Sequence, residues 1–156
     1  MNGEKGFTYP AALLLIIIVS ISLMVVQTHW STIMKRDREK ELFFRTSQII
    51  DGIESFYQNS PGGAQHYPRS LKVLLKDNRF PGRKRHLRKI FKDPMTEDGD
   101  WGIIYDGKGG IKGVFSRSRK EPIKKGGFPI EYKSFENKKK YSEWKFVYEP
   151  KKETTS

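Results

Sequence analysis

Three histidines are the first side chains of this sequence to consider for catalysis. His29, His66 and His86 are widely separated, and the chain contains no cysteine. No nucleophile motif stands beside any of them. The glycine-rich segment 106–110 lacks the Lys-Ser/Thr pair of a phosphate-binding loop, so we predict a hairpin turn there. These residues predict a protein that is not an enzyme and that uses no cofactor.

Four acidic side chains within eight residues form the group that most resembles a cation site. They are Asp93, Glu97, Asp98 and Asp100. Calcium prefers carboxylate oxygens, but this spacing is not that of an EF-hand loop. Acidic residues are also frequent in turns that hold no metal. We therefore interpret the segment as a solvated turn that Asp93-Pro94 begins, and we assign no metal site.

A basic run follows the middle of the chain. Its members are Arg79, Arg83, Lys84, Arg85, Arg88, Lys89 and Lys92, with Phe80 and Phe91 nearby. Such a run can bind phosphates, face solvent, or contact an acidic flank of a neighbouring subunit. No aromatic platform for stacking bases accompanies it. We favour the solvated face or the subunit contact over nucleic acid as the partner.

The composition narrows the class of protein. The chain has 156 residues, a net charge of +12 and 36% hydrophobic residues, which suits a single domain. Residues 79–156 hold 21 basic and 11 acidic residues, so the positive excess belongs to the second half. The absence of cysteine excludes a disulfide framework and thiolate metal sites.

The apolar residues gather near the N-terminus. Phe7–Val26 contains no charge and has about the 20 residues that one bilayer crossing needs. It is longer than the apolar region of a secretory signal peptide, and no Ala-x-Ala site follows it. We predict that residues 7–27 are a retained membrane anchor. The positive-inside rule, applied to the basic residues of 35–40, places the C-terminus in the cytoplasm.

The six polar residues before this run carry the most specific motif. MNGEKG ends in Gly6, and Phe7 and the apolar run follow at once. This resembles the class III signal of type IV pilins and type II secretion pseudopilins. The resemblance implies cleavage between Gly6 and Phe7 by prepilin peptidase, N-methylation of Phe7, and a translocated C-terminal part. The family's glutamate, which offsets the amine of an adjacent subunit, is replaced here by Ala11, and Pro10 precedes it.

The periodicity of the remaining chain predicts an α+β fold. Apolar residues recur at helical spacing through 28–59, which predicts an amphipathic continuation of the anchor helix. A short helix begins after Ser70 as N-cap and ends near Asp77, and 83–91 forms one further basic turn. Strands are predicted at 101–105, 111–116 and 142–148. We therefore expect a pilin-like fold, in which the outer half of a long helix packs on an antiparallel sheet of about three strands.

Several downstream segments also resemble one branch of type II secretion pseudopilins. They are residues 67–75, 80–82, 85–96, 101–104 and 110–118. The resemblance implies a structural subunit of a periplasmic pseudopilus that acts in protein export and is anchored in the bacterial inner membrane before assembly. Its partners would be other pseudopilins, prepilin peptidase, the assembly platform with its ATPase, and inner-membrane lipid.

This interpretation divides the chain into five parts and leaves two alternatives. The parts are a leader (1–6), a transmembrane or fibre-core helix (7–27), the periplasmic half of that helix (28–59), a globular head (60–149) and a disordered tail (150–156). One alternative is a minor type IV pilus or competence pilin that contacts DNA. The other is a simple signal-anchored periplasmic binding domain.

Overall fold

The computed structural model describes the backbone of residues 8–150 and their side chains, except those of Thr8 and of residues 23–31. The predicted leader, the cleavage site between Gly6 and Phe7, and the tail from residue 151 onward lie outside the described residues. The described chain forms two compact units that divide between Asp37 and Arg38. The division falls inside the range 28–59, which the sequence assigned to one element.

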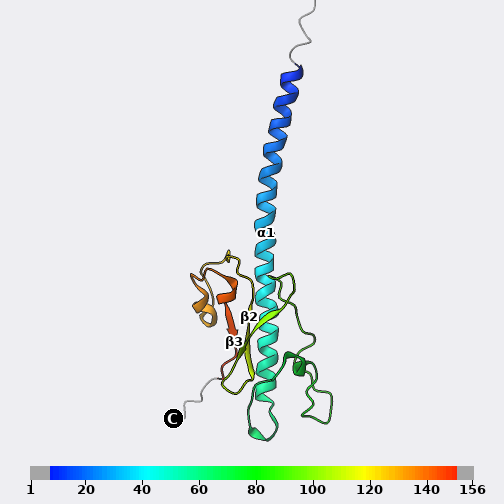
Figure 1. Cartoon of the computed structure of the whole chain (residues 1–156), viewed down its shortest axis with the longest axis vertical. Helices are drawn as coiled ribbons and strands as arrows, with labels where there is room; N and C mark the ends of the chain where they lie inside the picture. The colour runs from blue at the N-terminus through cyan, green and yellow to red at the C-terminus, as the bar shows by residue number, and fades with distance from the viewer. Residues whose placement is uncertain (1–7, 151–156) are drawn as a thin grey trace, which may run out of the picture. The chain divides into compact units, whose positions relative to one another are not determined.

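A single α-helix accounts for the first third of the chain, and short elements follow it (Figure 1). Helix α1 covers Thr8–Gln58, with 51 residues. The later elements are the 3₁₀ helices η1 (Pro61–Gly63) and η2 (Leu71–Leu75), the strands β1 (Trp101–Tyr105) and β2 (Ile111–Ser116), the 3₁₀ helices η3 (Ile130–Phe135) and η4 (Tyr141–Glu143), and the strand β3 (Lys145–Val147).

The first unit consists of α1 as far as Asp37 in the described range. Pro10 lies in the first turn, where the amide that proline lacks would have no partner within the helix. The large apolar side chains from Leu13 to Ile21 are between 45% and 63% exposed. Among the described residues, no helix combines the length and the apolarity that a bilayer crossing requires.

The second unit contains the antiparallel sheet that the sequence predicted, with strand order β1-β2-β3. Strands β1 and β2 have the predicted bounds, which confirms the α+β class. Strand β3 is shorter than predicted because η4 occupies the first residues of that range. There the Glu143 carboxylate accepts a hydrogen bond from the Lys139 amide at 2.9 Å and turns the chain before the strand begins.

The connection between β1 and β2 is the predicted hairpin turn. Asp106 Oδ1 accepts hydrogen bonds from the amides of Lys108 at 3.0 Å and Gly110 at 2.6 Å. Gly109 has a φ of 79°, which an L-residue with a side chain rarely adopts. The turn chemistry of Asp and Gly therefore sets the register of the first two strands.

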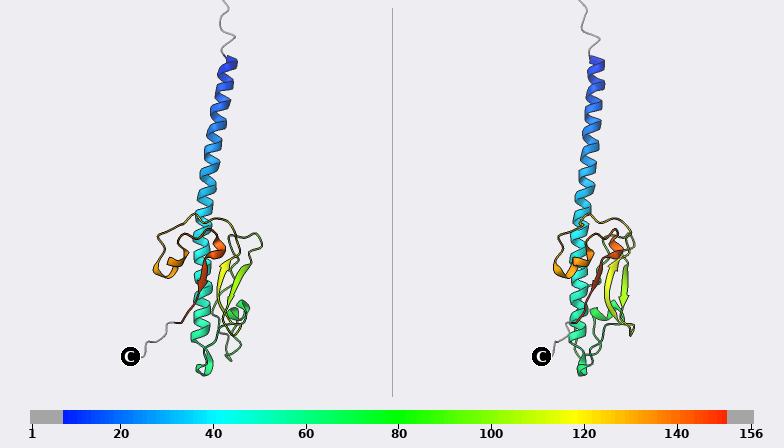
Figure 2. Two further views of the ribbon diagram at one scale, coloured as in Figure 1. Left: turned by 60° about the vertical axis from the view of Figure 1, so that its left-hand side comes forward. Right: turned by 90° about the vertical axis from the view of Figure 1, so that its left-hand side faces the viewer.

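The core of the second unit lies between the sheet and its own part of α1 (Figure 2). Leu42, Ile49, Ile53 and Phe56 follow one another at helical spacing and are all buried. They share one hydrophobic cluster with residues of all three strands. A group of aromatic rings surrounds Phe43, with centroids 5.4 to 6.4 Å away: Phe128, Tyr132, Phe135, Trp144 and Phe146.

The predicted helices between α1 and the sheet are only partly present. Element η2 begins after Ser70 as expected, but it is a 3₁₀ helix that ends at Leu75, and the Ser70 side chain makes no capping hydrogen bond. The prediction of a helical turn at 83–91 is wrong, because no helix is assigned to these residues. The Leu74 carbonyl, in η2, accepts hydrogen bonds from the amides of both His86 and Leu87 at 2.9 Å and holds this segment against η2.

Candidate functional site

The residues predicted for processing and assembly lie at or before the start of α1. Gly6 and Phe7 lie outside the described residues. Pro10 and Ala11 occupy the first turns of α1 and are exposed. The methyl group of Ala11 offers no hydrogen-bonding or charged atom at the position where the resembled family has a carboxylate.

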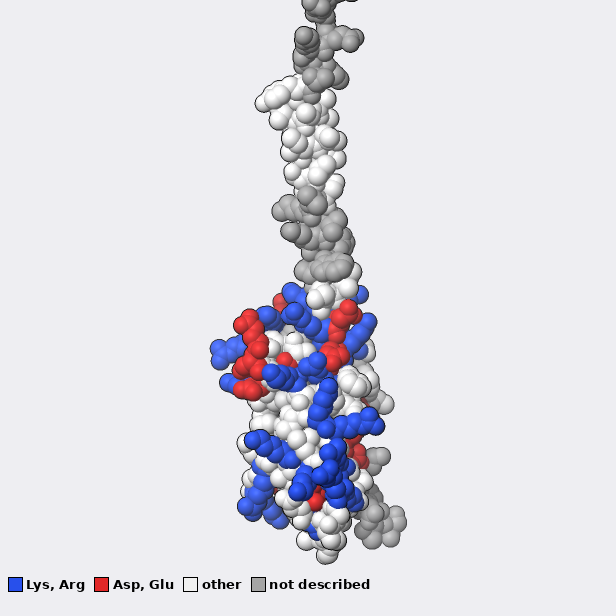
Figure 3. Space-filling view, turned by 90° about the vertical axis from the view of Figure 1, so that its right-hand side faces the viewer, with Lys and Arg blue, Asp and Glu red and all other residues white. Residues whose placement is uncertain are grey.

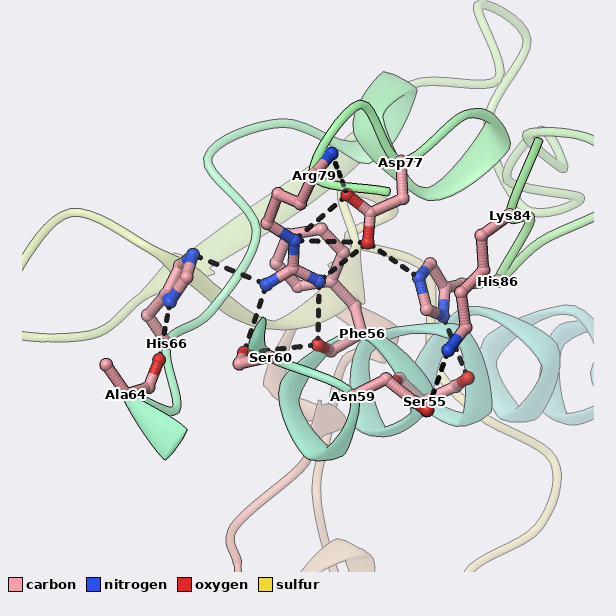
Figure 4. Close-up of polar contacts among 10 residues, drawn as sticks. All are labelled: Ser55, Phe56, Asn59, Ser60, Ala64, His66, Asp77, Arg79, Lys84 and His86. Carbon is pink, nitrogen blue, oxygen red and sulfur yellow. Dashed lines mark hydrogen bonds and ion pairs between the residues drawn. The ribbon is translucent and has the colours of Figure 1, made fainter. Parts of the chain in front are cut away.

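In the second unit, a buried carboxylate organises the segment after η2 (Figure 4). The side chain of Asp77 has no exposed surface. Arg79 donates to it from Nε (2.9 Å to Oδ1) and from Nη2 (2.7 Å to Oδ2), and the Arg79 amide donates to Oδ1 at 3.0 Å. These bonds from Arg79 hold the pKa of Asp77 well below its usual range, against the opposing effect of burial.

The same guanidinium closes the end of α1. Arg79 Nη2 donates to the Phe56 carbonyl and Nη1 donates to Ser60 Oγ, both at 3.0 Å. The guanidinium carbon also lies 3.5 Å from the centroid of the Phe56 ring. Carbonyls in the last turn of a helix have no partner within the helix, and Arg79 supplies one. The prediction that Arg79 belongs to a solvated or docking basic run is therefore wrong, because its guanidinium is hydrogen-bonded to Asp77, Phe56 and Ser60 inside the protein.

His86 completes this group, which we call the Asp77 network: Ser55, Phe56, Ser60, Asp77, Arg79 and His86. His86 Nε2 lies 3.1 Å from Asp77 Oδ2, and Nδ1 lies 2.8 Å from Ser55 Oγ. The chain of contacts from Ser55 through His86 to Asp77 has the residue types of a hydrolase triad. However, the His86 side chain has no exposed surface, and the Asp77 carboxylate is also paired with Arg79. The arrangement fixes the chain in place and offers no access to a substrate.

Sequence reasoning missed this network. It treated the histidines as unrelated, whereas His66 Nε2 lies 3.4 Å from Arg79 Nη1 and His86 contacts Asp77. One signal was available: Asp77 is the one acidic residue of segment 69–92. A lone carboxylate among so many cations has a strong electrostatic reason to be buried and paired.

The remaining cations of this segment point outward. We call them the basic face: Arg69, Lys72, Lys76, Arg83, Lys84, Arg85, Arg88, Lys89 and Lys92. All except the half-buried Lys84 are exposed, and none forms an ion pair with the described part of the chain. Figure 3 shows the side of the second unit on which segment 69–92 lies. Lys and Arg side chains, in blue, gather over the lower part of this view, with little acidic surface among them.

The acidic segment at 93–100 is a turn, but its first residue is not solvated as we predicted. Asp93 is buried, and its carboxylate accepts hydrogen bonds from the Met95 amide (2.9 Å) and from Ser116 Oγ (2.7 Å). Asp98 and Asp100 lie 3.6 and 3.9 Å from Arg117 Nη1. Among the side chains that the structure describes, those of residues 9–22 and 32–150, no three His, Cys, Asp or Glu residues are grouped in a way that would hold a metal ion.

A third buried carboxylate, also missed from the sequence, ties α1 to the C-terminal half of the head. Glu39 Oε1 accepts hydrogen bonds from the Ile123 amide at 2.6 Å and from the Tyr141 hydroxyl at 2.7 Å. Burial, together with the bond to Glu39, raises the pKa of Tyr141 above its usual value. Glu39 lies in an alternating charged stretch whose sequence resembles a fully solvated helix surface, so no local pattern marks it.

The chemistry that this head offers to a partner is therefore positive charge on the basic face, since the buried carboxylates of Glu39, Asp77 and Asp93 serve internal contacts. Comparisons of the chain with protein-family models, with curated proteins and with solved structures each found no match.

Proposed function

We propose that this chain is a non-enzymatic structural subunit of a periplasmic pseudopilus in a type II secretion system, anchored in the inner membrane before it is assembled. The observation that carries the proposal is the six-residue polar leader that ends in Gly6, directly before Phe7 and an uncharged apolar run. Cleavage at this point removes the polar residues and leaves the apolar helix intact.

Two features of the described residues support the proposal. The apolar side chains from Leu13 to Ile21 are exposed on α1, and a row of this size needs lipid or other helices around it. The hydroxyls of Ser20 and Ser22 donate to the carbonyls four residues earlier, at 2.7 and 2.8 Å. Polar groups satisfied within the helix suit an apolar environment.

The intact mass of the protein extracted from membranes tests this proposal. We expect a mass that corresponds to loss of residues 1–6 and gain of one methyl group. Gly6→Val should leave the full-length precursor in cells that contain prepilin peptidase, since the side chain obstructs the extended fit in the peptidase cleft. A native chain that keeps residues 1–6 in those cells would contradict the proposal.

A further inference from the structure

The positive charge of the basic face is not balanced by nearby acidic residues. Segment 69–92 holds ten Lys and Arg residues and one acidic residue, Asp77, whose carboxylate the Asp77 network already occupies. Segment 117–145 also has ten basic residues, but four acidic residues are mixed among them, and Lys125 pairs with Glu121 at 2.8 Å. Uncompensated charge is therefore concentrated on the basic face.

The backbone that carries these cations is held in place by hydrogen bonds and by buried side chains. The Asp77 amide donates to the Lys84 carbonyl at 2.9 Å, and Lys84 Nζ donates to Asn59 Oδ1 at 2.8 Å. Leu74 and Leu87, beneath the face, are buried. A partner that docks here meets a surface whose backbone is already ordered, so binding orders few additional groups.

The rings beside the basic face are not free to stack on bases. Lys84 Nζ lies 4.3 Å from the centroid of the Phe80 ring. Lys89 Nζ lies 5.1 Å from the centroid of the Phe91 ring, and the Phe44 ring packs edge-on against Phe91 with a centroid distance of 6.2 Å. A single-stranded nucleic acid would need such rings as stacking platforms, so the face presents charge without the apolar contacts that this ligand uses.

A second copy of the same chain is also a poor match. Each chain carries a net charge of +12, and like charges pressed together within the Debye length of about 8 Å repel one another at physiological salt. A fibre nevertheless brings subunit heads close to each other. The neighbour that meets this face at the lowest electrostatic cost is a different chain with an acidic surface.

We infer that the basic face docks onto an acidic surface of a different protein subunit in the same fibre. This inference rests on the proposed function and adds to it the chemistry of the neighbour. The partner supplies Asp and Glu side chains opposite the basic face, and the pairing fixes which subunit stands beside this one.

A matched pair of charge-reversal variants tests the face in vitro. The face variant carries Lys76→Glu, Arg83→Glu, Arg85→Glu and Arg88→Glu. The control variant carries Lys133→Glu, Lys138→Glu, Lys139→Glu and Lys145→Glu, so both have the same net charge. All eight residues are exposed and none has an ion pair in the described chain. Far-UV circular dichroism checks that both remain folded.

The probe for this comparison is poly-L-glutamate, added to the full chain in non-ionic detergent at physiological salt. We expect the face variant to bind at least about tenfold more weakly than the native chain, and the control variant to change by no more than about twofold. Equal losses in the two variants would show that binding follows net charge, and would overturn the inference.

Crosslinking in the host cell identifies the partner. A photo-crosslinking amino acid in place of Arg85 should give a product with a different pilin-like subunit, joined at a peptide rich in Asp and Glu, and the same residue in place of Lys139 should not. Products with DNA, with lipid or with a second copy of this chain, or no product from position 85, would overturn the inference.

The intact mass of the chain from the same cells separates the docking inference from the proposed function. A processed chain without this product refutes the docking alone, whereas an unprocessed chain refutes the proposed function.

Discussion

At the scale of single residues, Asp77 shows how a head with a large positive charge keeps a defined structure. Its carboxylate joins the segment after η2 to the end of α1 through Arg79, which also reaches the Phe56 carbonyl. A buried carboxylate is costly unless its partners are in place, and here Arg79 and His86 supply them. Loss of the charge at Asp77 should therefore loosen the segment after η2 and its contacts with the end of α1.

Asp77→Asn should lower the free energy of unfolding by about 3 kcal/mol, because it leaves the Arg79 guanidinium without its ion-pair partner in a largely buried position. Urea unfolding of the full chain in detergent, followed by far-UV circular dichroism, measures this change. Asp100→Asn is the control, since that residue is exposed and its contact with Arg117 is 3.9 Å long. Equal effects of the two substitutions would contradict the role of Asp77.

The lowered pKa of Asp77 also predicts how stability depends on pH. Because the pKa is lower in the folded chain than in the unfolded chain, the stabilisation is complete at neutral pH. It is lost as the pH falls below the unfolded value of about 4 toward the folded value. The urea midpoint of the native chain should fall more steeply below pH 4 than that of Asp77→Asn. Parallel curves for the two proteins would refute this assignment.

At the scale of elements, Glu39 connects α1 to the loop before η3 and to η4. Its Oε1 atom accepts from the Ile123 amide and from the Tyr141 hydroxyl, so one side chain of α1 holds two distant segments. Two aromatic residues that pack against Phe43 lie in or next to these segments: Phe128, in the loop before η3, and Trp144, directly after η4. Their packing therefore depends on a polar contact at the edge of an apolar cluster.

Glu39→Gln should destabilise the second unit by about 2 kcal/mol, because the hydrogen bonds of a charged acceptor become weaker neutral ones. Tyr141→Phe should cost about 1 kcal/mol, and the double variant should cost less than the sum, since the two residues share one bond. Hydrogen exchange of the amides of residues 123 and 124 is the measurement. Exact additivity would show that the Glu39–Tyr141 contact contributes nothing.

The sequence predicted the elements that carry a local pattern. Strands β1 and β2 are short, largely apolar runs that flank a Gly-rich turn, so both were found with their bounds. The prediction of a turn at 83–91 was wrong because the conformation of this segment depends on hydrogen bonds to the Leu74 carbonyl, which are tertiary contacts. The burial of Glu39 was missed for the same reason: residues that lie close to it in the sequence do not show that the Ile123 amide and the Tyr141 hydroxyl satisfy it.

At the scale of the whole molecule, Ala11 bears on how the subunit is used. In the family that the leader resembles, the glutamate at this position offsets the new N-terminal amine of an adjacent subunit inside the apolar core of the fibre. Ala11 supplies no charge, and an unpaired charge in an apolar environment is costly. A subunit of this kind is disfavoured as the repeating unit, and it suits a position where that contact is absent.

We therefore predict that this chain, produced with prepilin peptidase and the assembly platform but without other pseudopilins, does not form long fibres. Electron microscopy of sheared surface material is the measurement. Ala11→Glu is the informative variant, because it restores the carboxylate and should increase fibre length if the amine is the obstacle. Long fibres of the native chain alone would contradict the prediction.

The aromatic cluster around Phe43 also has a spectroscopic consequence. The Trp144 ring stacks on Phe135 with an interplanar angle of 5° and a centroid distance of 5.6 Å, and Trp101 is buried in the same unit. Rings fixed at such angles in an asymmetric environment absorb left- and right-handed light differently between 250 and 300 nm, which are about the wavelengths at which aromatic side chains absorb. With Trp30→Phe, the remaining indole signal comes from the second unit alone. The chain thus contains its own label for following that unit in detergent, in lipid or in a fibre.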